Sequence, residues 1–444
     1  MSTAELAART ASGGGEEDRP LPDIRTLGPW YLAEFLCSYA ATLFTVGCYD
    51  YATDFLKASP SSRLWLSAGW GLAYIPIALL AGKISEKWGP RLAVLVMTTA
   101  CVATCSLALA ALAVPMIWML ALVMLPYNYT STTIWPAIES ALTRTPGKMR
   151  LSTRMALFNL SWGSAGFAAF FTHGALERVW WGTIFAVPAI SCGCAALVTW
   201  KWGIPASMMG REHVPDDEGG EHELEVPGMR RRAEAMLKMA WVGNALAYTA
   251  IYVLIPVMTK LAQMASPLAA RNLAIAGFIT ATWSFMRFAG FATMWKWSGW
   301  HYKVRYLMGA QTALALSFLG MLLIHNLAVI IALQVVFGFS VALIYSSSLY
   351  YAMHVSSGHG GHAGIHEAVI GTGVMLGPTI GALAGTGELG VGAMQRIGLG
   401  VTTVLVLGIG VQGWLALKMR TPHSEKLKGD ADGIAAPSGT GGVP

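Results

Sequence analysis

Charged residues are scarce in this chain. Asp, Glu, Lys and Arg make up 12% of its 444 residues, about half the share found in soluble domains. Hydrophobic residues make up 55% of the chain, and the mean hydropathy is +0.52. So little polar surface cannot cover a soluble globule of this size, which excludes an ordinary soluble enzyme or binding domain. The net charge of +6 does not indicate nucleic-acid binding, because the basic residues stand in short segments between apolar runs.

Motifs of other protein classes are missing as well. The six cysteines stand in apolar stretches and none forms a CxxC pair, so we interpret them as small buried hydrophobic residues. The ATP-binding pattern GxxxxGK[ST] does not occur. We recognise no secretory signal, since residues 1–29 are polar and the following apolar run is long and has no cleavage site. We expect no cofactor, no metal and no enzymatic activity.

Long apolar runs are what the sequence has instead. Each run is about 20 residues long, which is enough to cross a bilayer as a helix. The twelve predicted spans are 30–56, 63–82, 91–112, 115–142, 151–172, 179–202, 236–262, 272–295, 304–324, 326–354, 365–387 and 391–418.

The spans divide the chain into five parts. We predict a cytoplasmic N-terminal tail at 1–29, a six-helix bundle at 30–202, a charged cytoplasmic connector at 203–235, a second six-helix bundle at 236–418 and a disordered cytoplasmic tail at 419–444. Most lysines and arginines outside the spans fall on the side of the two termini. By the positive-inside rule, both termini are then cytoplasmic, which agrees with an even number of spans.

A short charged segment, GKISEKWGPR, separates the second predicted span from the third. Its pattern of Gly82, Glu86, Gly89 and Arg91 resembles the signature loop between helices 2 and 3 of the major facilitator superfamily of transporters. Glu86 stands where that family usually has Asp, and Pro90 stands where it usually has a basic residue.

The second half of the chain holds a degenerate copy of this segment. Ala292, Lys296, Gly299 and His301 repeat the spacing between the second and third spans of their own half. The resemblance covers roughly residues 25–420. It implies an all-α polytopic membrane protein, with twelve transmembrane helices in two pseudo-symmetric six-helix bundles, a central cavity and alternating access by rocking.

Histidines crowd the segment before the eleventh span: His354, His359, His362 and His366. A metal site, a solvated loop and a gate are all open interpretations. In the gate hypothesis, the eleventh helix begins around residues 365–367 and turns its partly positive N-terminus toward Glu86. Protonated His366 then strengthens that contact. The predicted gating residues are Gly82, Glu86, Gly89, Arg91, His366 and Glu367.

Arg287 is the clearest charge inside a predicted span, in the run TATWSFMRFAGF. A charge in the bilayer costs about 2.5–3.5 kcal/mol on insertion scales, so its presence calls for a reason. Arg287 either binds an anionic group of a solute or a coupling carboxylate, or it pairs with a carboxylate of another helix to hold the bundle together.

Acidic residues inside spans are candidates for proton coupling, because a buried carboxyl can exchange a proton near neutral pH. We select Glu34 and Glu139. Each has a structural alternative: Glu34 can snorkel to the membrane surface, and Glu139 can pair with a nearby arginine. We expect Asp50 to lie on a solvated rim.

Amide and tyrosine side chains are candidates for lining a cavity. Asn244, Tyr248 and Tyr252 follow one helical face at intervals of four residues. Membrane-interface belts and helix packing are the alternative for such residues. The full set of substrate and coupling candidates is Glu34, Asn128, Glu139, Asn159, Asn244, Tyr248, Tyr252, Arg287 and Tyr345.

These observations predict a secondary active transporter of the inner (plasma) membrane. We expect it to move a small solute by alternating access, coupled to protons, as a monomer in the lipid bilayer without a nucleic-acid partner. A facilitative uniporter and a drug efflux pump remain open, as does a non-transporting membrane sensor or enzyme.

Overall fold

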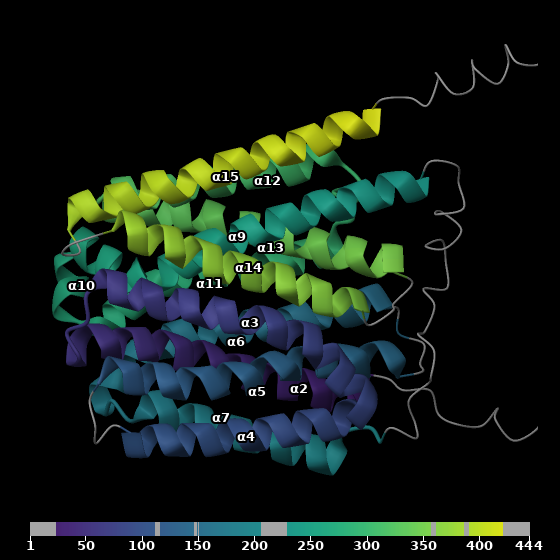
Figure 1. The fold of residues 1–444 in the computed structure, drawn as a ribbon, viewed down its shortest axis with the longest axis horizontal. Coiled ribbons are helices and arrows are strands. Elements are labelled where there is room, and N and C mark those ends of the chain that lie inside the picture. Colours follow the sequence, from purple (N-terminus) through teal and green to yellow (C-terminus); the bar gives the residue numbers. More distant parts are fainter. Residues whose placement is uncertain are drawn as a thin grey trace, which may run out of the picture.

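In the computed structural model, the described residues are 24–111, 116–145, 149, 151–205, 229–356, 361–385 and 390–420. Twelve α-helices of 20 residues or more account for most of this part of the chain (Figure 1). The predicted tails and connector lie largely outside the described residues, as do His359 and the side chains of His354 and His362.

The helices follow the order that the apolar runs predict. The N-terminal half holds α2 (Ile24–Asp50) with the π-helical turn η2 (Tyr51–Phe55), α3 (Pro60–Trp88), α4 (Pro90–Ala111), α5 (Ile117–Arg144), α6 (Leu151–Val179) and α7 (Thr183–Trp202). The C-terminal half holds α9 (Met229–Ala265), the short α10 (Pro267–Arg271), α11 (Leu273–Lys296), α12 (Val304–Leu323), α13 (Leu327–Ser356), α14 (Gly361–Ala384) and α15 (Val391–Arg420).

Helix starts and ends show familiar capping chemistry. Ser59 precedes Pro60 and accepts a hydrogen bond from the backbone N–H of Ser62 at 3.1 Å. Ser266 stands in the same way before α10. Such caps satisfy backbone donors at the first helical turn, where proline is tolerated because its missing N–H would have no partner.

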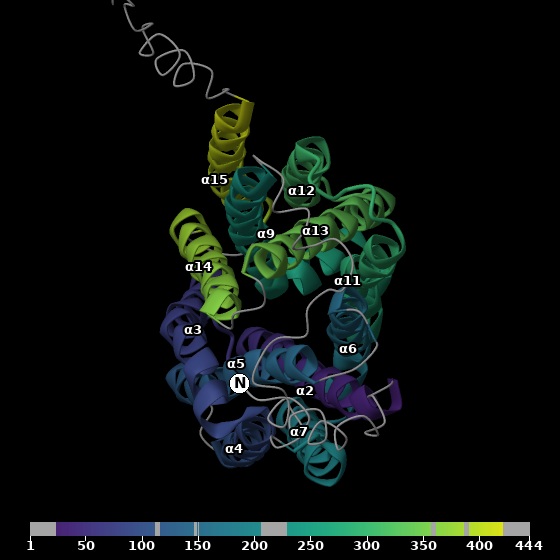
Figure 2. The ribbon, with the colours of Figure 1, turned by 90° about the vertical axis from the view of Figure 1, so that its right-hand side faces the viewer.

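The helices of each half pack mainly against one another. The two halves meet where α3 lies beside α14 and where α6 lies beside α11 (Figure 2). We call the end of the bundle at which α2 begins the near end, and the end at which α2 finishes the far end. The near end is on the right in Figure 1 and the far end, with α10, is on the left.

Ten helices of the described residues are long and apolar enough to cross a membrane. The two long helices outside that set are α5 and α6, which carry polar stripes. Buried Asn128, Thr132 and Glu139 follow α5, and buried Arg154 and His173 follow α6. The prediction of twelve spans thus agrees with the number of long helices, while length and hydropathy alone select ten.

The GKISEKWGPR segment is mostly helix, and its interpretation as a loop is wrong. The α3 helix continues through Trp88, and only Gly89 separates it from Pro90, the first residue of α4. Gly89 has a φ of 78°, which is available to glycine, and its N–H bonds to the carbonyl of Ser85 at 3.0 Å. The apolar run ends at the first charge, but the helix extends beyond it, because charged residues such as Lys87 are good helix formers.

The eleventh helix also starts earlier than predicted. Its first residue is Gly361, not a residue near Ile365. His366 and Glu367 therefore lie inside α14, away from its N-terminal turn.

Candidate functional site: a cavity between the two halves

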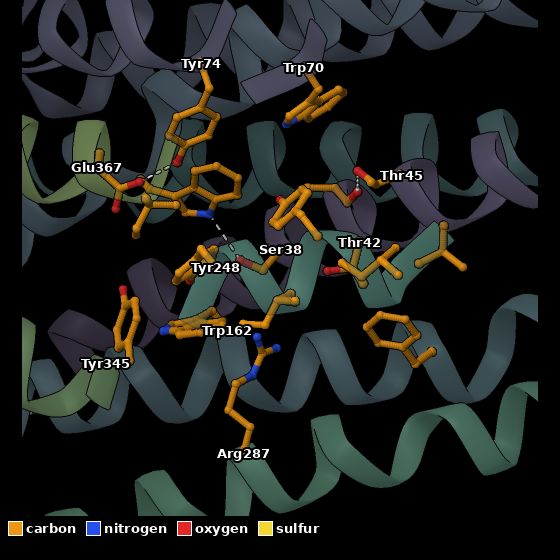
Figure 3. A pocket seen from close by; sticks show the side chains of 18 of the residues that line it. Ser38, Thr42, Thr45, Trp70, Tyr74, Trp162, Tyr248, Arg287, Tyr345 and Glu367 are labelled. Atoms are coloured by element: carbon orange, nitrogen blue, oxygen red, sulfur yellow. Dashed lines mark hydrogen bonds between the residues drawn. The ribbon is translucent and has the colours of Figure 1, made fainter. Parts of the chain in front are cut away.

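A cavity lies between the halves and encloses about 920 Å³ of empty space, part of it open to solvent. Helices of both halves line it, and ten of the lining residues are aromatic (Figure 3). The lining residues are Glu34, Ser38, Ala41, Thr42, Thr45, Val46, Trp70, Tyr74, Trp135, Phe158, Trp162, Phe170, Tyr248, Ile251, Tyr252, Ile255, Trp283, Arg287, Tyr345, Glu367 and Ile370.

Arg287 of α11 reaches into this cavity from one wall (Figure 3). Its guanidinium lies over the rings of Trp162, at 4.3 Å, and Trp283, at 5.0 Å. Nη2 donates to Ser284 Oγ at a long 3.4 Å, and Nε has no hydrogen-bond partner among the described residues. A methyl group on Gly166 of α6 would lie 2.7 Å from Nη2, so a glycine there makes room for the charge.

Arg287 makes no ion pair within the described part of the chain. Of the two sequence-based interpretations, the structural pairing with a carboxylate is therefore not observed. Aromatic faces stabilise the cation through their quadrupoles but leave its N–H donors available. Two of these N–H donors can then bind two oxygens of one anionic group through parallel hydrogen bonds, as guanidinium binds carboxylate or phosphate.

Two carboxyl groups line the cavity nearer the near end. Glu34 Oε1 accepts a hydrogen bond from Ser38 Oγ at 2.6 Å, and Ser38 in turn accepts one from Trp135 Nε1 at 3.2 Å. Glu367 accepts a hydrogen bond from the hydroxyl of Tyr74, which links α14 to α3 (Figure 3). The snorkelling alternative for Glu34 does not hold, since its exposed fraction is 0%.

Glu139 of α5 lies behind this wall. Its charge is close enough to those of Glu34 and Glu367 to interact with them, although it does not line the cavity. It makes no ion pair in the described residues, and its Oε1 accepts no hydrogen bond there. Three carboxyl groups from three helices are thus brought together by the fold.

Tyrosines connect the acidic and basic walls. Tyr248 and Tyr252 stack with ring centroids 6.2 Å apart, and Tyr345 lies edge-on to Trp162 at 4.9 Å. These rings are rigid, with apolar faces and a polar edge, which suits a site for a partly apolar solute.

A family model, the Major Facilitator Superfamily, matches residues 30–356. The chain belongs to the Major Facilitator Superfamily. It is a multi-pass membrane transporter and not an enzyme. The resemblance seen in Gly82–Arg91 is confirmed.

Solved structures of transporters share the fold. A mutant of the nucleoside transporter NupG superposes with a TM-score of 0.66 at 15% identity, covering 88% of this chain and 99% of that one. The human organic anion transporter MFSD10 gives 0.62 at 12% identity, covering 89% and 100%. A structure of a proton dependent oligopeptide transporter gives 0.64 at 11% identity, covering 89% and 98%. A comparison with curated protein sequences gives no match.

Five of the nine predicted substrate and coupling candidates line the transporter's cavity: Glu34, Tyr248, Tyr252, Arg287 and Tyr345. The three amides do not. Asn128 joins α5 to α3 by donating to the carbonyl of Trp70 at 2.8 Å, and Asn159 accepts from Trp162 Nε1 at 3.1 Å. Asn244 is fully buried away from the cavity, and neither amide atom has a partner among the described residues.

The predicted contact between Glu86 and His366 is absent from the described residues. Glu86 is exposed in the last turn of α3, whereas His366 is buried and its Nδ1 lies 3.0 Å from Ser348 Oγ of α13. Glu367 lines the cavity and does not belong to a gating loop. Arg91 bonds to the carbonyls of Thr199 and Trp200, and so neutralises the negative C-terminal end of α7.

Sequence reasoning missed several lining residues that had a readable signal. Ser38, Thr42 and Thr45 continue the face of α2 on which the predicted Glu34 lies, at intervals of four, four and three residues. Such a polar stripe in a membrane span indicates a wet or protein-facing surface.

Proposed function

We propose that this transporter moves a small anionic or zwitterionic solute together with protons by alternating access. The observation that carries the proposal is the cavity itself, with Arg287 on one wall and the carboxyl groups of Glu34 and Glu367 on another. A facilitative uniporter needs only a solute site and would have no use for three buried acids. An efflux pump for cationic drugs would not retain an unneutralised arginine in its binding site.

The charge of Arg287 supports the anionic part of the proposal. It is buried, with 7% of its surface exposed, and it faces two tryptophans and no acid. An anion that enters the cavity would supply the missing counter-charge and gain hydrogen bonds from donors that are already in place. The surrounding aromatic rings favour a solute with an apolar or aromatic portion.

Glu34, Glu139 and Glu367 support proton coupling. Like charges placed close together in a low dielectric repel, so the group gains stability by holding protons. Movement of α14 against α3 would break the bond between Tyr74 and Glu367 and change the surroundings of that carboxyl. Proton release is thereby linked to the conformational step, as secondary transport requires.

The orientation and the moving units complete the proposal. The lysine- and arginine-rich side is the near end, which we infer to face the cytoplasm of the cell that carries the protein in its plasma membrane. The units 30–202 and 236–418 would rock as two bodies around the cavity. A monomer suffices, because the cavity is complete within one chain.

Solute chemistry is tested by thermal-shift screening of the purified protein. The library pairs each carboxylate with its neutral amide or ester, and includes nucleosides, sugars and short peptides. We expect stabilisation by the carboxylates, lost in Arg287→Gln, partly kept in Arg287→Lys and unchanged in Arg230→Gln, whose side chain is 77% exposed. Neutral partners that stabilise wild type and Arg287→Gln equally would refute the anionic assignment.

Coupling is tested in proteoliposomes with the solute that the screen identifies. An imposed proton gradient should drive accumulation by the wild type and by the exposed-surface control Glu234→Gln. Glu367→Gln should still equilibrate the solute but lose accumulation, because the amide cannot release a proton. Unchanged accumulation by Glu367→Gln, Glu34→Gln and Glu139→Gln would exclude these acids as the coupling group.

A further inference from the structure

A second group of ionisable side chains lies at the far end, outside the cavity. Asp50 ends α2, and His173 and Glu177 stand one turn apart on α6. Their exposed fractions are 7%, 0% and 4%. The prediction of a solvated rim position for Asp50 is wrong, since the residue is buried against α6.

His173 and Asp50 form a buried polar contact. His173 Nδ1 lies 2.6 Å from the carbonyl oxygen of Phe170, and because a carbonyl can only accept, Nδ1 carries hydrogen. Nε2 lies 3.4 Å from Asp50 Oδ2, and no hydrogen bond joins these two atoms. Two lone pairs would repel at that distance, so the pair shares one proton, carried by the imidazole or by the carboxyl.

Glu177 is the third member of the group. Neither carboxyl oxygen accepts a hydrogen bond from the described residues, and Asp50 and Asp54, whose charges act on this carboxyl, are also acids. A buried carboxylate without donors is costly. The carboxyl is therefore held as the neutral acid in this conformation.

The group borders the seam between the halves. A methyl group on Gly277 of α11 would lie 2.9 Å from His173 Cε1. One residue further along α6, Gly174 approaches the backbone of Leu273 closely. Arg178 Nη1 donates to Asn272 Oδ1 at 2.8 Å. The seam between α6 and α11 is thus closed at the far end, directly beside the shared proton.

Other ionisable side chains near the group come from α2, η2, the segment after η2, α3 and α9. Cys48 lies near Glu177, and Arg63 interacts with both Asp50 and Asp54. Lys57 and Lys260 interact with Asp54. On the α11 side, Leu273 and Gly277 bring no charge to the seam.

We propose that Asp50, His173 and Glu177 form a proton-binding site that holds the far end of the α6–α11 seam closed. Alternating access requires this seam to part. Water would then reach the three side chains, and Glu177 would lose its proton to the compartment at the far end. Because the closed state binds more protons, acid favours the closed seam and rising pH favours the open one. The site needs no particular solute and does not depend on coupling by Glu34 or Glu367.

The test measures the seam directly in purified protein without added solute. Spin labels are placed at Val179, the last residue of α6, and at Leu268 of α10. The exposed fractions of these side chains are 80% and 66%. Cys194, the exposed cysteine, is first replaced by serine. Between about pH 5 and pH 8, the population with the short, closed distance should fall relative to the population with the long, open distance as the pH rises. The change should approach tenfold per pH unit for each proton bound.

Variants assign the effect to the site. Glu177→Gln mimics the protonated acid and should keep the seam closed at the upper pH, with a flatter profile. The controls Glu234→Gln and His325→Gln should follow wild type. The infrared spectrum of wild type minus that of Glu177→Gln should show the band of one protonated carboxyl.

Three outcomes would overturn the proposal. They are a wild-type seam distance that does not change with pH, a Glu177→Gln profile equal to that of wild type, and no protonated carboxyl band in the spectrum of wild type minus Glu177→Gln. Failure to find a transported solute would leave the distance measurement intact, so the proposed function and this site are judged separately.

Discussion

Replacement of Arg287 by glutamine should weaken solute binding strongly while leaving the stability of the protein nearly unchanged. Most buried arginines behave in the opposite way, because they hold structure together. Arg154 of α6 provides the comparison within the same chain. Its Nη1 donates to the carbonyls of Leu142 at 2.8 Å and Thr145 at 2.5 Å, and its Nε donates to Met149 at 2.9 Å.

The expected magnitudes follow from the contacts of each arginine. Placing a guanidinium in a span costs about 2.5–3.5 kcal/mol, and each of the two tryptophan contacts of Arg287 returns about 1–2 kcal/mol. These terms nearly cancel, so Arg287→Gln should change the free energy of unfolding by less than about 1 kcal/mol. Arg154→Gln loses charged hydrogen bonds of about 1.5–3 kcal/mol each, and should cost about 3 kcal/mol or more.

For solute binding we expect the reverse: Arg287→Gln should lose more affinity than Arg154→Gln. Removal of one partner of a buried charged pair costs about 2–4 kcal/mol, which weakens binding of a carboxylate roughly 30- to 700-fold. Arg154→Gln should bind the same carboxylate with wild-type affinity wherever it remains folded. Chemical unfolding in one detergent and equilibrium binding to the screened carboxylate give both quantities. A loss of stability in Arg287→Gln as large as that in Arg154→Gln, with unaltered affinity, would refute the assignment of Arg287 to the solute.

Three further substitutions test the geometry. Gly166→Ala places a methyl group 2.7 Å from Arg287 Nη2 and should weaken carboxylate binding without removing the charge, whereas Gly309→Ala, which meets nothing within 4 Å, should not. Gly174→Ala drives a methyl group against the backbone of Leu273 and should shift the spin-label distance at the far end toward the open state at every pH. Tyr248→Phe removes a hydroxyl from the cavity wall and should lower affinity about tenfold by equilibrium binding. Its control, Tyr129→Phe, lies 40% exposed outside the cavity and should have no effect.

The membrane fold could be predicted from the sequence because the bilayer leaves few choices. Backbone groups in hydrocarbon must bond within their own segment, so an apolar run of sufficient length is a helix. The same rule explains the error at Gly82–Trp88: hydropathy shows where the hydrocarbon ends, and α3 continues past that point into a polar medium. Gly89 and Pro90 mark the true end of the helix, and both were readable as capping residues.

The candidate site was only partly predictable. Arg287 and Glu34 could be selected because a charge in a span is costly and therefore rare. The bond between Tyr74 and Glu367 joins residues 293 positions apart, and the contact of Asp50 with His173 joins α2 to α6. Such pairs depend on which helices become neighbours, and hydropathy carries no information about that. The same lack of information led to the wrong predictions that Glu367 stands at the start of its helix and that Asp50 lies on a rim.

The position of the two proposed proton-binding groups along α2 gives a reason why one chain would keep both. Glu34 and Asp50 are 16 residues apart on the same helix, which corresponds to about 24 Å at 1.5 Å per residue. That distance is most of the roughly 30 Å hydrocarbon thickness. Arg287, Tyr248 and the polar stripe of α2 lie along the cavity.

A proton held at Glu34 or Glu367 is therefore within reach of the near-end compartment, whereas one held by Asp50 and His173 is within reach of the far-end compartment once the seam parts. Because neither group spans the membrane alone, a proton can cross only when the halves change their packing, and a transporter built in this way does not leak protons while it waits for its solute.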